Sequence, residues 1–295
     1  MQRRFVIASL LTVLSGGLHA MERVVSLAPS VTETVLALGL EEALIARTRY
    51  CPGHKGAGKE ILEDMVQPSV ERLLGLRPDL ILASDPTPEP VVRRLRDARL
   101  RVERLPTRDL ASVMANLRRT GELLGAKAGG EKLADEVQRR IEAVERVTAP
   151  LPPGRLPRVV LFYGTHPEFC AGAGSFTGEI LACAGGRNVA ADSATAWPSL
   201  GRERLLQWDP EVILISLTES AEELAEARTT VRGWEGETGW NRLSAVRSGR
   251  IVFVTGSLLM IPGPRVGEAV EAVARALHPE LFAALQPREL HFLEP

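Results

Sequence analysis

Cysteine and histidine side chains flank two segments of the chain that read as loops. The first segment is Tyr50-Cys-Pro-Gly-His54 and the second is His166-Pro-Glu-Phe-Cys170. Thiolate and imidazole groups are good ligands for zinc and other soft metals, and a Cys-x₂-His spacing occurs in such sites. Closed structural sites show tighter paired motifs, so we predict no metal site here. A disulfide between Cys51 and Cys170, and loops without any ligand, remain open alternatives.

Three aromatic residues are the next candidates, because aromatic residues make up only 4% of the chain. Tyr50 follows a predicted strand, Phe169 lies in the second of the loops above, and Trp197 precedes Pro198. Clefts of open α/β sheets form at strand ends and loops. Flat aromatic faces add apolar area to such a cleft at a low cost in entropy. The alternative is that each ring folds onto its own part of the protein.

Catalytic groups are not apparent in the sequence. No Ser-His-Asp order or close pair of carboxylates stands out. The segment Gly172-Ala-Gly174-Ser175 lacks the lysine of a phosphate-binding loop and reads as a turn followed by a helix cap. Trp234 and Trp240 are expected to pack inside the protein. We therefore predict a binding protein without cofactor, not an enzyme.

An internal repeat gives the strongest sequence signal. Residues 70–84 (VERLLGLRPDLILAS) and 202–216 (RERLLQWDPEVILIS) align at an offset of 132 without gaps, and eight of the fifteen positions are identical. Each copy reads as a short helix, a turn containing proline, and a buried strand. Glu71 and Glu203 occupy equivalent positions, so each is expected to project from one of two similar lobes. The alternative for these glutamates is a solvated helix face with a local Glu-Arg pair.

The elements around these residues alternate between strand and helix, which predicts mostly parallel sheets covered by helices. A capping box is expected at the first helix, with Ser30 as the cap and Glu33 reaching back to it. A long amphipathic helix over 131–147 carries Leu133, Val137, Ile141 and Val144 on one face. Expected strands cover residues 23–27, 44–48, 79–84, 101–105, 158–164, 212–216 and 251–255, and other helices cover 88–98, 109–124 and 265–277.

The N-terminus resembles a secretory signal peptide over residues 1–20, with Arg3 and Arg4 before a short apolar run that ends in small residues at Ala20. Its removal takes away two of the 36 basic residues and none of the 37 acidic ones, so the mature chain carries a net charge of 34 − 37 = −3. This charge excludes the basic face of a nucleic-acid-binding protein. Export permits one disulfide among Cys51, Cys170 and Cys183, and the sequence does not select the pair.

Taken together, several ordered segments resemble one family: the substrate-binding proteins of ABC importers for cobalamin and iron chelates, and within it the cobalamin-binding branch. The resemblance is carried by residues 23–33 (RVVSLAPSVTE), 70–82, 174–176 (GSF), 183–188 (CAGGRN) and 197–203. It implies two Rossmann-like α/β lobes joined by one long α-helix, with the ligand cleft between the lobes. The expected division is a signal peptide at 1–20, an N-terminal lobe at 21–125, the connecting helix at 126–149 and a C-terminal lobe at 150–295.

The resemblance also assigns expected roles. Glu71 and Glu203 correspond to acidic residues that meet arginines on the two halves of a permease dimer in the inner membrane. Tyr50, Phe169 and Trp197 correspond to cleft aromatics, and Arg265 to a cleft arginine, although Arg265 is equally placed to cap the last helix. Ser30, His54 and His166 are further candidates for ligand contact, the histidines as axial nitrogen ligands of a corrinoid or haem.

Departures from the family's pattern bear on the ligand. The cobalamin-binding pattern has tryptophans near Met65–Val66 and Ser84–Asp85, acidic and aromatic residues near Leu258–Met260, and a second disulfide cysteine near the C-terminus, none of which this chain has. We therefore expect a less aromatic cleft. The prediction is a monomeric periplasmic protein that binds a corrinoid-like metal chelate. Haem or a ferric siderophore is the alternative ligand, and a tetrapyrrole chelatase is the distant alternative function.

Overall fold

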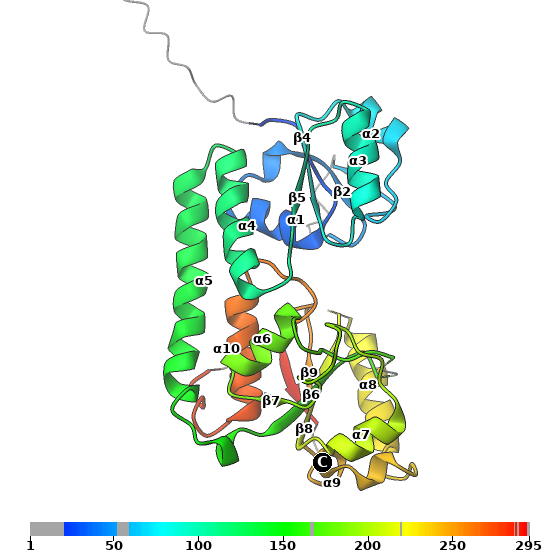
Figure 1. Cartoon of the computed structure of the whole chain (residues 1–295), viewed down its shortest axis with the longest axis vertical. Helices are drawn as coiled ribbons and strands as arrows, with labels where there is room; N and C mark the ends of the chain where they lie inside the picture. The colour runs from blue at the N-terminus through cyan, green and yellow to red at the C-terminus, as the bar shows by residue number, and fades with distance from the viewer. Residues whose placement is uncertain are drawn as a thin grey trace, which may run out of the picture.

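The computed structural model describes residues 21–51, 59–165, 168–218, 220–285, 287 and 289–293. The predicted signal peptide, His54 and His166 lie outside these residues. The chain forms two lobes, each built on a five-stranded sheet, and one long helix, α5 (Lys127–Thr148), runs along both (Figure 1). The predicted α/β class with two lobes is confirmed. Among the described residues, no helix has both the length and the hydrophobicity needed to cross a membrane.

The N-terminal lobe contains a fully parallel sheet with strand order β3-β2-β1-β4-β5. All five residues of the strand β4 are buried, as expected for a parallel strand covered on both faces. The strands are β1 (Val24–Ser26), β2 (Leu44–Thr48), β3 (Glu60–Leu62), β4 (Leu80–Ser84) and β5 (Val102–Leu105), and the helices are α1 (Pro29–Ala37), α2 (Val70–Leu76) and α3 (Glu89–Asp97), with a 3₁₀ turn at Glu41–Ala43.

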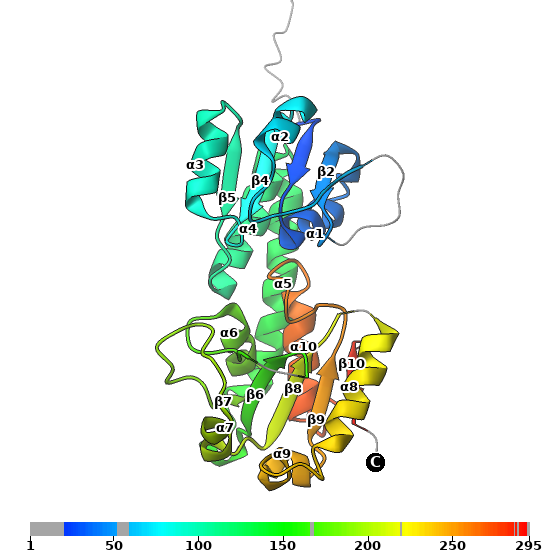
Figure 2. The same cartoon turned by 90° about the vertical axis from the view of Figure 1, so that its right-hand side faces the viewer.

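The C-terminal lobe has the strand order β10-β9-β8-β6-β7, with β10 antiparallel to β9 at one edge (Figure 2). The strands are β6 (Arg158–Tyr163), β7 (Arg187–Asn188), β8 (Val212–Ser216), β9 (Ile251–Val254) and β10 (Leu290–Phe292), and the helices are α6 (Phe176–Cys183), α7 (Arg202–Trp208), α8 (Ala221–Gly233), α9 (Ser244–Arg247) and α10 (Val266–Leu277), with 3₁₀ turns at Pro153–Arg155 and Trp240–Arg242. Trp234 and Trp240 stack inside this lobe with ring centroids 4.0 Å apart, so the predicted packing role of both is confirmed.

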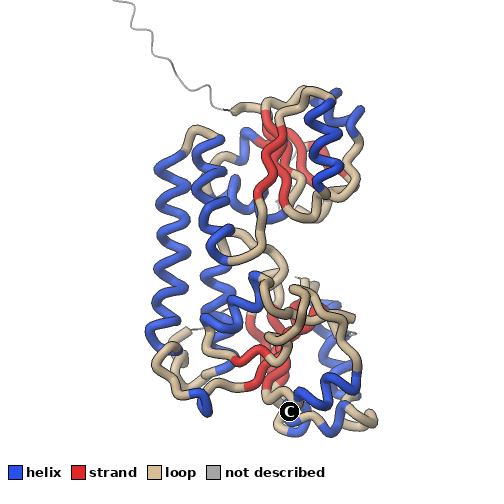
Figure 3. Tube along the Cα trace, viewed as in Figure 1, coloured by secondary structure: helices blue, strands red, loops and turns tan. Residues whose placement is uncertain are grey.

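The helix α5 (Lys127–Thr148) lies along one side of both lobes, and the antiparallel helix α4 (Leu110–Leu123) lies beside its first part (Figure 3). They approach closely because both contact positions are glycines: a Cβ on Gly121 would lie 2.8 Å from the Cα of Gly130. Further along, a Cβ on Gly267 of α10 would lie 3.0 Å from the Cβ of Arg140 on α5. The predicted long helix is therefore fixed against α4 at one end and against the C-terminal lobe at the other. Its buried face includes Val137, Ile141 and Val144, as the spacing predicted.

The sequence repeat is also a structural repeat. Both α2 and α7 end in a non-glycine residue in the left-handed region, at Arg77 (φ 47°) and Asp209 (φ 41°), and a proline and a central buried strand follow each. An arginine that precedes or begins the neighbouring strand binds each of these helix ends. Arg23 donates to the carbonyls of Leu76 and Arg77, and Arg158 donates to the carbonyl of Asp209. The two lobes thus share the local hydrogen bonding as well as the order of elements.

The expected capping box at α1 is wrong. The helix begins at Pro29, whose fixed φ and missing N–H suit the first helical position, and the cap position is Ala28 without a side-chain hydrogen bond. Glu33 does not return to the start of its own helix, because Arg265, 232 residues away, donates to its carboxylate. This long-range contact replaces the local one that the Ser30-to-Glu33 spacing suggested.

Candidate functional site

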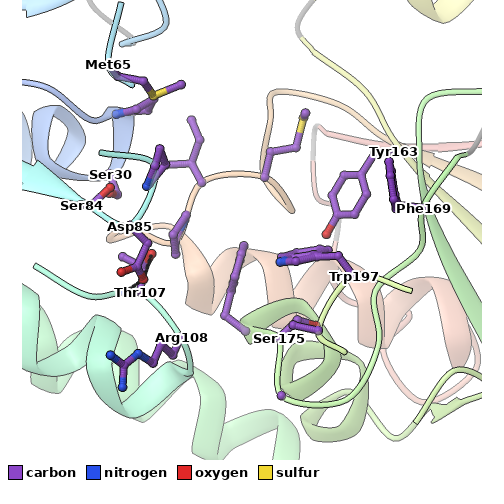
Figure 4. A pocket seen from close by; sticks show the side chains of 18 residues that line it. Ser30, Met65, Ser84, Asp85, Thr107, Arg108, Tyr163, Phe169, Ser175 and Trp197 are labelled. Carbon is purple, nitrogen blue, oxygen red and sulfur yellow. Dashed lines mark hydrogen bonds between the residues drawn. The ribbon is translucent and has the colours of Figure 1, made fainter. Parts of the chain in front are cut away.

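A cavity of about 720 Å³ lies between the two lobes (Figure 4). This volume is within the range of small-molecule binding sites. The N-terminal lobe contributes the following lining residues: Pro29, Ser30, Met65, Ser84, Asp85, Pro86, Thr107 and Arg108. The C-terminal lobe contributes Tyr163, Phe169, Gly174, Ser175, Phe176, Ala196, Trp197, Met260, Ile261 and Pro262.

The cavity lies at the carboxyl ends of both sheets. Ser84 is the last residue of β4, Thr107 follows β5 by two residues, and Tyr163 is the last residue of β6. Because parallel strands end at the same edge of a sheet, the loops that follow them converge there, and ligands of open α/β folds bind at this edge. The fold therefore directs the loops of the two lobes toward one shared space.

Four aromatic rings, all from the C-terminal lobe, form one wall of the cavity. Trp197 meets Tyr163 edge to face, with ring centroids 5.4 Å apart. Phe169 is 50% exposed and Trp197 is 44% exposed, whereas Phe176 is buried at the start of α6. Figure 4 shows Tyr163, Phe169 and Trp197 together on one side of the cavity. This wall offers a flat apolar ligand the exposed faces of two rings on a preformed support.

The hydroxyl of Tyr163 is held within this wall. It lies 2.9 Å from the Oγ1 of Thr177 on α6, and burial raises the pKa of Tyr163 far above its usual range. The phenol therefore stays neutral at physiological pH and serves as a fixed polar group among the rings.

The N-terminal lobe offers a wall of different chemistry, without an aromatic ring among the described residues that line the cavity. Asp85 accepts hydrogen bonds from the backbone N–H and the hydroxyl of Thr107, at 2.6 and 3.3 Å, and forms an ion pair with Arg104 at 3.0 Å. These contacts fix the carboxylate and compensate its charge. Ser30 and Ser84 add hydroxyl groups on this side (Figure 4).

Methionines lie in two of the segments where the resemblance led us to expect a tryptophan or acidic and aromatic residues. Met65 lines the cavity from the N-terminal lobe and Met260 from the C-terminal lobe, and Ser84 and Asp85 occupy the remaining site of a missing tryptophan. Methionine is unbranched and adapts its shape to its neighbours. The N-terminal side of the cavity therefore carries a methionine and hydroxyl groups and no aromatic ring among the described lining residues.

The sequence-predicted ligand residues are only partly brought together. Ser30, Phe169 and Trp197 line the cavity. Tyr50 is 48% exposed and is not among the lining residues; the Arg49 guanidinium lies 4.9 Å from its ring centroid and donates to its hydroxyl at 2.7 Å. His54 and His166 lie outside the described residues. The binding roles of all of these residues stay predictions.

Arg265 lies behind the cavity and is not among its lining residues. It immediately precedes α10 without capping it through its side chain. Its guanidinium bonds the carboxylate of Glu33 and the carbonyl of Gly256. Arg265 thus occupies the cap position of α10 without a side-chain cap bond, and its predicted role as a cleft arginine stays a prediction.

The cysteines are free thiols in this structure, so the alternative of a Cys51–Cys170 disulfide is not formed. Cys51 contacts the hydroxyl of Thr48 at 3.2 Å, and Cys170 lies in the core of the C-terminal lobe. Burial raises the pKa of Cys170 to about 11 and that of Cys183 to about 12, the latter also through a hydrogen bond to Glu145. Among the described residues, no group of three His, Cys, Asp or Glu side chains is arranged to hold a metal ion.

Tyr163 and Phe176 are the aromatic residues of the cavity that the sequence analysis did not select as ligand contacts. The available signals were the position of Tyr163 at the end of a predicted strand and the Gly-Ser-Phe segment before α6. Neither signal identifies the cavity by itself, because an aromatic residue at a strand end is able to pack against its own lobe as well as to face a cleft.

Glu71 and Glu203 lie in the first turns of α2 and α7, both exposed and without an ion pair to another described residue. The local pairing alternative is not observed, since Arg72 bonds Glu60 and the Arg204 guanidinium lies 5.5 Å from the ring centroid of Trp208. In Figure 1 both helices lie on the side of the molecule opposite α5. Each lobe thus exposes one acidic side chain to solvent, at the equivalent position in the first turn of its repeated helix.

Similarity to known proteins agrees with this architecture. A vitamin B12-binding protein from Pectobacterium atrosepticum is 30% identical over 204 residues, which cover 66% of this chain and 71% of that protein. The structure of the periplasmic vitamin B12 binding protein BtuF of Vibrio cholerae has a TM-score of 0.74 at 25% identity and covers 88% of this chain and 98% of that one. The periplasmic heme-binding protein BhuT in complex with two hemes has a TM-score of 0.75 at 27% identity, with the same coverage.

The model of one protein family, described as periplasmic binding protein, matches residues 24–258. This range includes both sheets apart from the final edge strand β10, the helices α4 and α5, and most of the cavity lining. With its two α/β lobes and the cavity between them, the chain belongs to the periplasmic binding protein family.

Proposed function

We propose that this chain is the substrate-binding protein of an ABC importer, that it binds a corrinoid in the cavity between its lobes, and that it delivers this ligand to a permease dimer. The observation that carries the proposal is the interlobe cavity with its exposed Trp197 and Phe169, in a chain similar to vitamin B12-binding proteins. A macrocycle presents a broad apolar face, and the aromatic wall supplies a matching one. Release at the permease requires that docking lower the affinity for the ligand.

A second candidate ligand is haem. The similarity to a protein in complex with two hemes supports it, as does the one-sided aromatic wall, which lacks the additional rings of the cobalamin-binding pattern. In this candidate the planar macrocycle lies on the same wall, and the thioethers of Met65 and Met260, which line the cavity, are the groups that would bind its iron.

Thermal unfolding of the purified mature protein with cyanocobalamin, cobinamide, hemin and ferric siderophores tests the ligand class. A ligand at a thousandfold excess over its Kd stabilises the folded state by about 4 kcal/mol. For a chain of this size the midpoint then rises by roughly 7 °C. A rise with a corrinoid and not with hemin supports the proposal; a rise with hemin alone selects the second candidate; no rise with any of them refutes both.

Glu71 and Glu203 are the proposed contacts with the permease. A symmetric pair of acidic side chains, one on each lobe, fits a partner with two equivalent basic surfaces and sets the orientation of docking. The absence of an ion pair from either carboxylate to another described residue supports this role.

Export is the last part of the proposal. Residues 1–20 act as a cleaved signal peptide, and the mature protein is a periplasmic monomer. N-terminal sequencing of the exported protein, with a start near Met21, and its mass by light scattering test these two points. An uncleaved N-terminus or a stable dimer contradicts them.

A further inference from the structure

We infer that Glu33 and Arg265 form an interlobe clamp. The clamp sets the spacing of the two lobes at the floor of the ligand cavity, which is formed by Pro29, Ser30, Ile261 and Pro262. Arg265 thus acts on binding through this spacing and not by contact with the ligand. The ligand part of this inference rests on the proposed function. Glu33 belongs to α1 of the N-terminal lobe, and Arg265 precedes α10 of the C-terminal lobe.

The clamp joins three segments. The Nε and Nη2 of Arg265 donate to the Oε1 of Glu33 at 3.1 and 2.6 Å, and Nη2 also donates to the carbonyl of Gly256 at 3.0 Å. Gly256 follows β9, so the arginine ties its own loop to the sheet edge of the C-terminal lobe while it holds the helix of the other lobe. The C-terminal lobe therefore holds the guanidinium of Arg265 in place, and the bond from this guanidinium to Glu33 fixes α1 relative to the C-terminal lobe.

Burial makes this ion pair more costly to break than a surface contact. The Glu33 side chain is 8% exposed and that of Arg265 is 27% exposed. Removal of one partner from a pair of this kind leaves a charge in a poorly solvated place, which costs more than the loss of an exposed pair. Among the ion pairs of the described residues, this is the one that links an element before α4 directly to an element after α5.

The clamp lies directly behind the cavity floor. Gly263 separates the two: a Cβ at this position would lie 3.0 Å from the Oε2 of Glu33 and 3.5 Å from the Cα of Ser30. Pro262 and Ile261 on one side, and Ser30 and its neighbour Pro29 on the other, line the cavity. The two lobes therefore lie so close where the floor is formed that a side chain at position 263 would force a local shift, and the ion pair holds this approach.

Arg265 and Glu33 face a separate cavity of about 330 Å³ at the back of this contact, between α1, α5 and α10. This position explains how Arg265 affects binding without reaching the ligand. When the ion pair is removed, α1 is free to shift relative to the 261–264 turn. The two segments that form the cavity floor then no longer keep their relative positions.

The test measures lobe spacing without any ligand. Spin labels at Arg93→Cys on α3 and Glu226→Cys on α8, both exposed, report the distance between the lobes by pulsed electron resonance. The background carries Cys183→Ser, because the other two native thiols are buried. We expect a narrow distance distribution for the unsubstituted clamp. In Glu33→Gln and in Arg265→Gln, the distribution broadens or its maximum moves by more than the original half-width, while Arg265→Lys, which keeps the charge, stays close to the original.

The matched control is Arg158→Gln. Arg158 also bonds a carbonyl and a carboxylate, both of Asp209, but this contact lies within the C-terminal lobe. The control therefore loses stability without a change in lobe spacing. Cyanocobalamin and hemin titrations of the same variants give the second readout: Kd rises about tenfold in both clamp variants, and the double variant is no weaker than the weaker single one.

Three results overturn the inference: unchanged distances in both clamp variants, equal broadening in Arg158→Gln, or a loss of affinity in Arg265→Gln without any change in distance, which makes Arg265 a direct ligand contact. If the unsubstituted protein binds neither probe, the proposed function fails, while the distance measurement still decides whether the clamp exists.

Discussion

Trp197→Ala is the sharpest test of the cavity as the ligand site. A fully buried aromatic side chain removes up to about 250 Å² from water, so at 44% exposure Trp197 has roughly 110 Å² left to cover. At about 25 cal/mol per Å², complete coverage contributes about 2.8 kcal/mol and coverage of one ring face about half of that. The edge contact between Trp197 and Tyr163 is present before and after binding, so it does not contribute to the binding free energy. Kd should therefore rise by roughly 10- to 100-fold.

Isothermal titration with the ligand that stabilises the protein measures this change. Trp197→Phe keeps a flat ring and should lose less than the alanine variant. Phe292→Ala is the matched control, since this ring on β10 is 41% exposed but does not line the cavity, and its removal should leave Kd unchanged. An unchanged Kd in Trp197→Ala refutes the reasoning. So does a larger loss in Tyr50→Ala, because the structure places Tyr50 outside the lining residues.

Three further predictions follow from contacts elsewhere in the molecule. Glu71→Arg combined with Glu203→Arg should leave ligand affinity unchanged and abolish uptake by vesicles that contain the cognate permease; unchanged uptake contradicts the docking role. Asp109→Ala should destabilise the protein by about 1 kcal/mol in urea unfolding, because the carboxylate caps α4 by accepting from the N–H of Ser112 at 2.7 Å. This hydrogen bond lowers the pKa of Asp109, so its contribution is present above the unfolded value near 3.9 and is lost as pH falls through the lower folded value; a variant with the same acid sensitivity as the unsubstituted protein contradicts this assignment. Ellman's reagent at pH 8 should react slowly with the native protein, because burial raises the pKa of Cys170 and Cys183, and should titrate three thiols in denaturant; fewer than three indicates a disulfide.

The two-lobed architecture was predictable because its signal is local. A helix, a left-handed turn before proline and a buried strand are each specified by adjacent residues, and the same specification occurs twice at an offset of 132. The long helix was predictable for the same reason, since its apolar positions recur every three or four residues. Its glycine contacts with α4 and α10 were not, because a close approach depends on which residues face each other across two helices.

The error at α1 has the opposite cause. Ser30 and Glu33 have the spacing of a capping box, and a local hydrogen bond is the default for such a pair. Arg265 arrives from the far end of the chain and offers the carboxylate a charged partner in a buried place. A charge-assisted bond of this kind outcompetes a capping bond, which contributes about 1 kcal/mol. Sequence spacing carries no information about this competitor, so the same residue pair supported a wrong local interpretation and left the interlobe contact undetected.

The aromatic residues of the cleft could also be predicted one by one from the local sequence, whereas their contacts with one another depend on distant segments. Phe169 and Trp197 were identified one by one as loop aromatics, but they become neighbours only because Phe169 bridges to Ser199, thirty residues along the chain. Tyr163 joins them from the end of β6 and Phe176 from the start of α6, so one lobe holds the complete aromatic wall before any ligand arrives. The opposite wall consists of hydroxyls, a compensated carboxylate, a methionine, two prolines and the Arg108 side chain. Apolar area on the first wall should therefore set most of the affinity, whereas the polar groups of the second, held in place by α1 and the strand ends of the N-terminal lobe, should decide which macrocycle periphery is accepted. Substitutions on the two walls should separate these effects: Trp197→Ala weakens all ligands of the class alike, and Ser84→Ala changes their ranking.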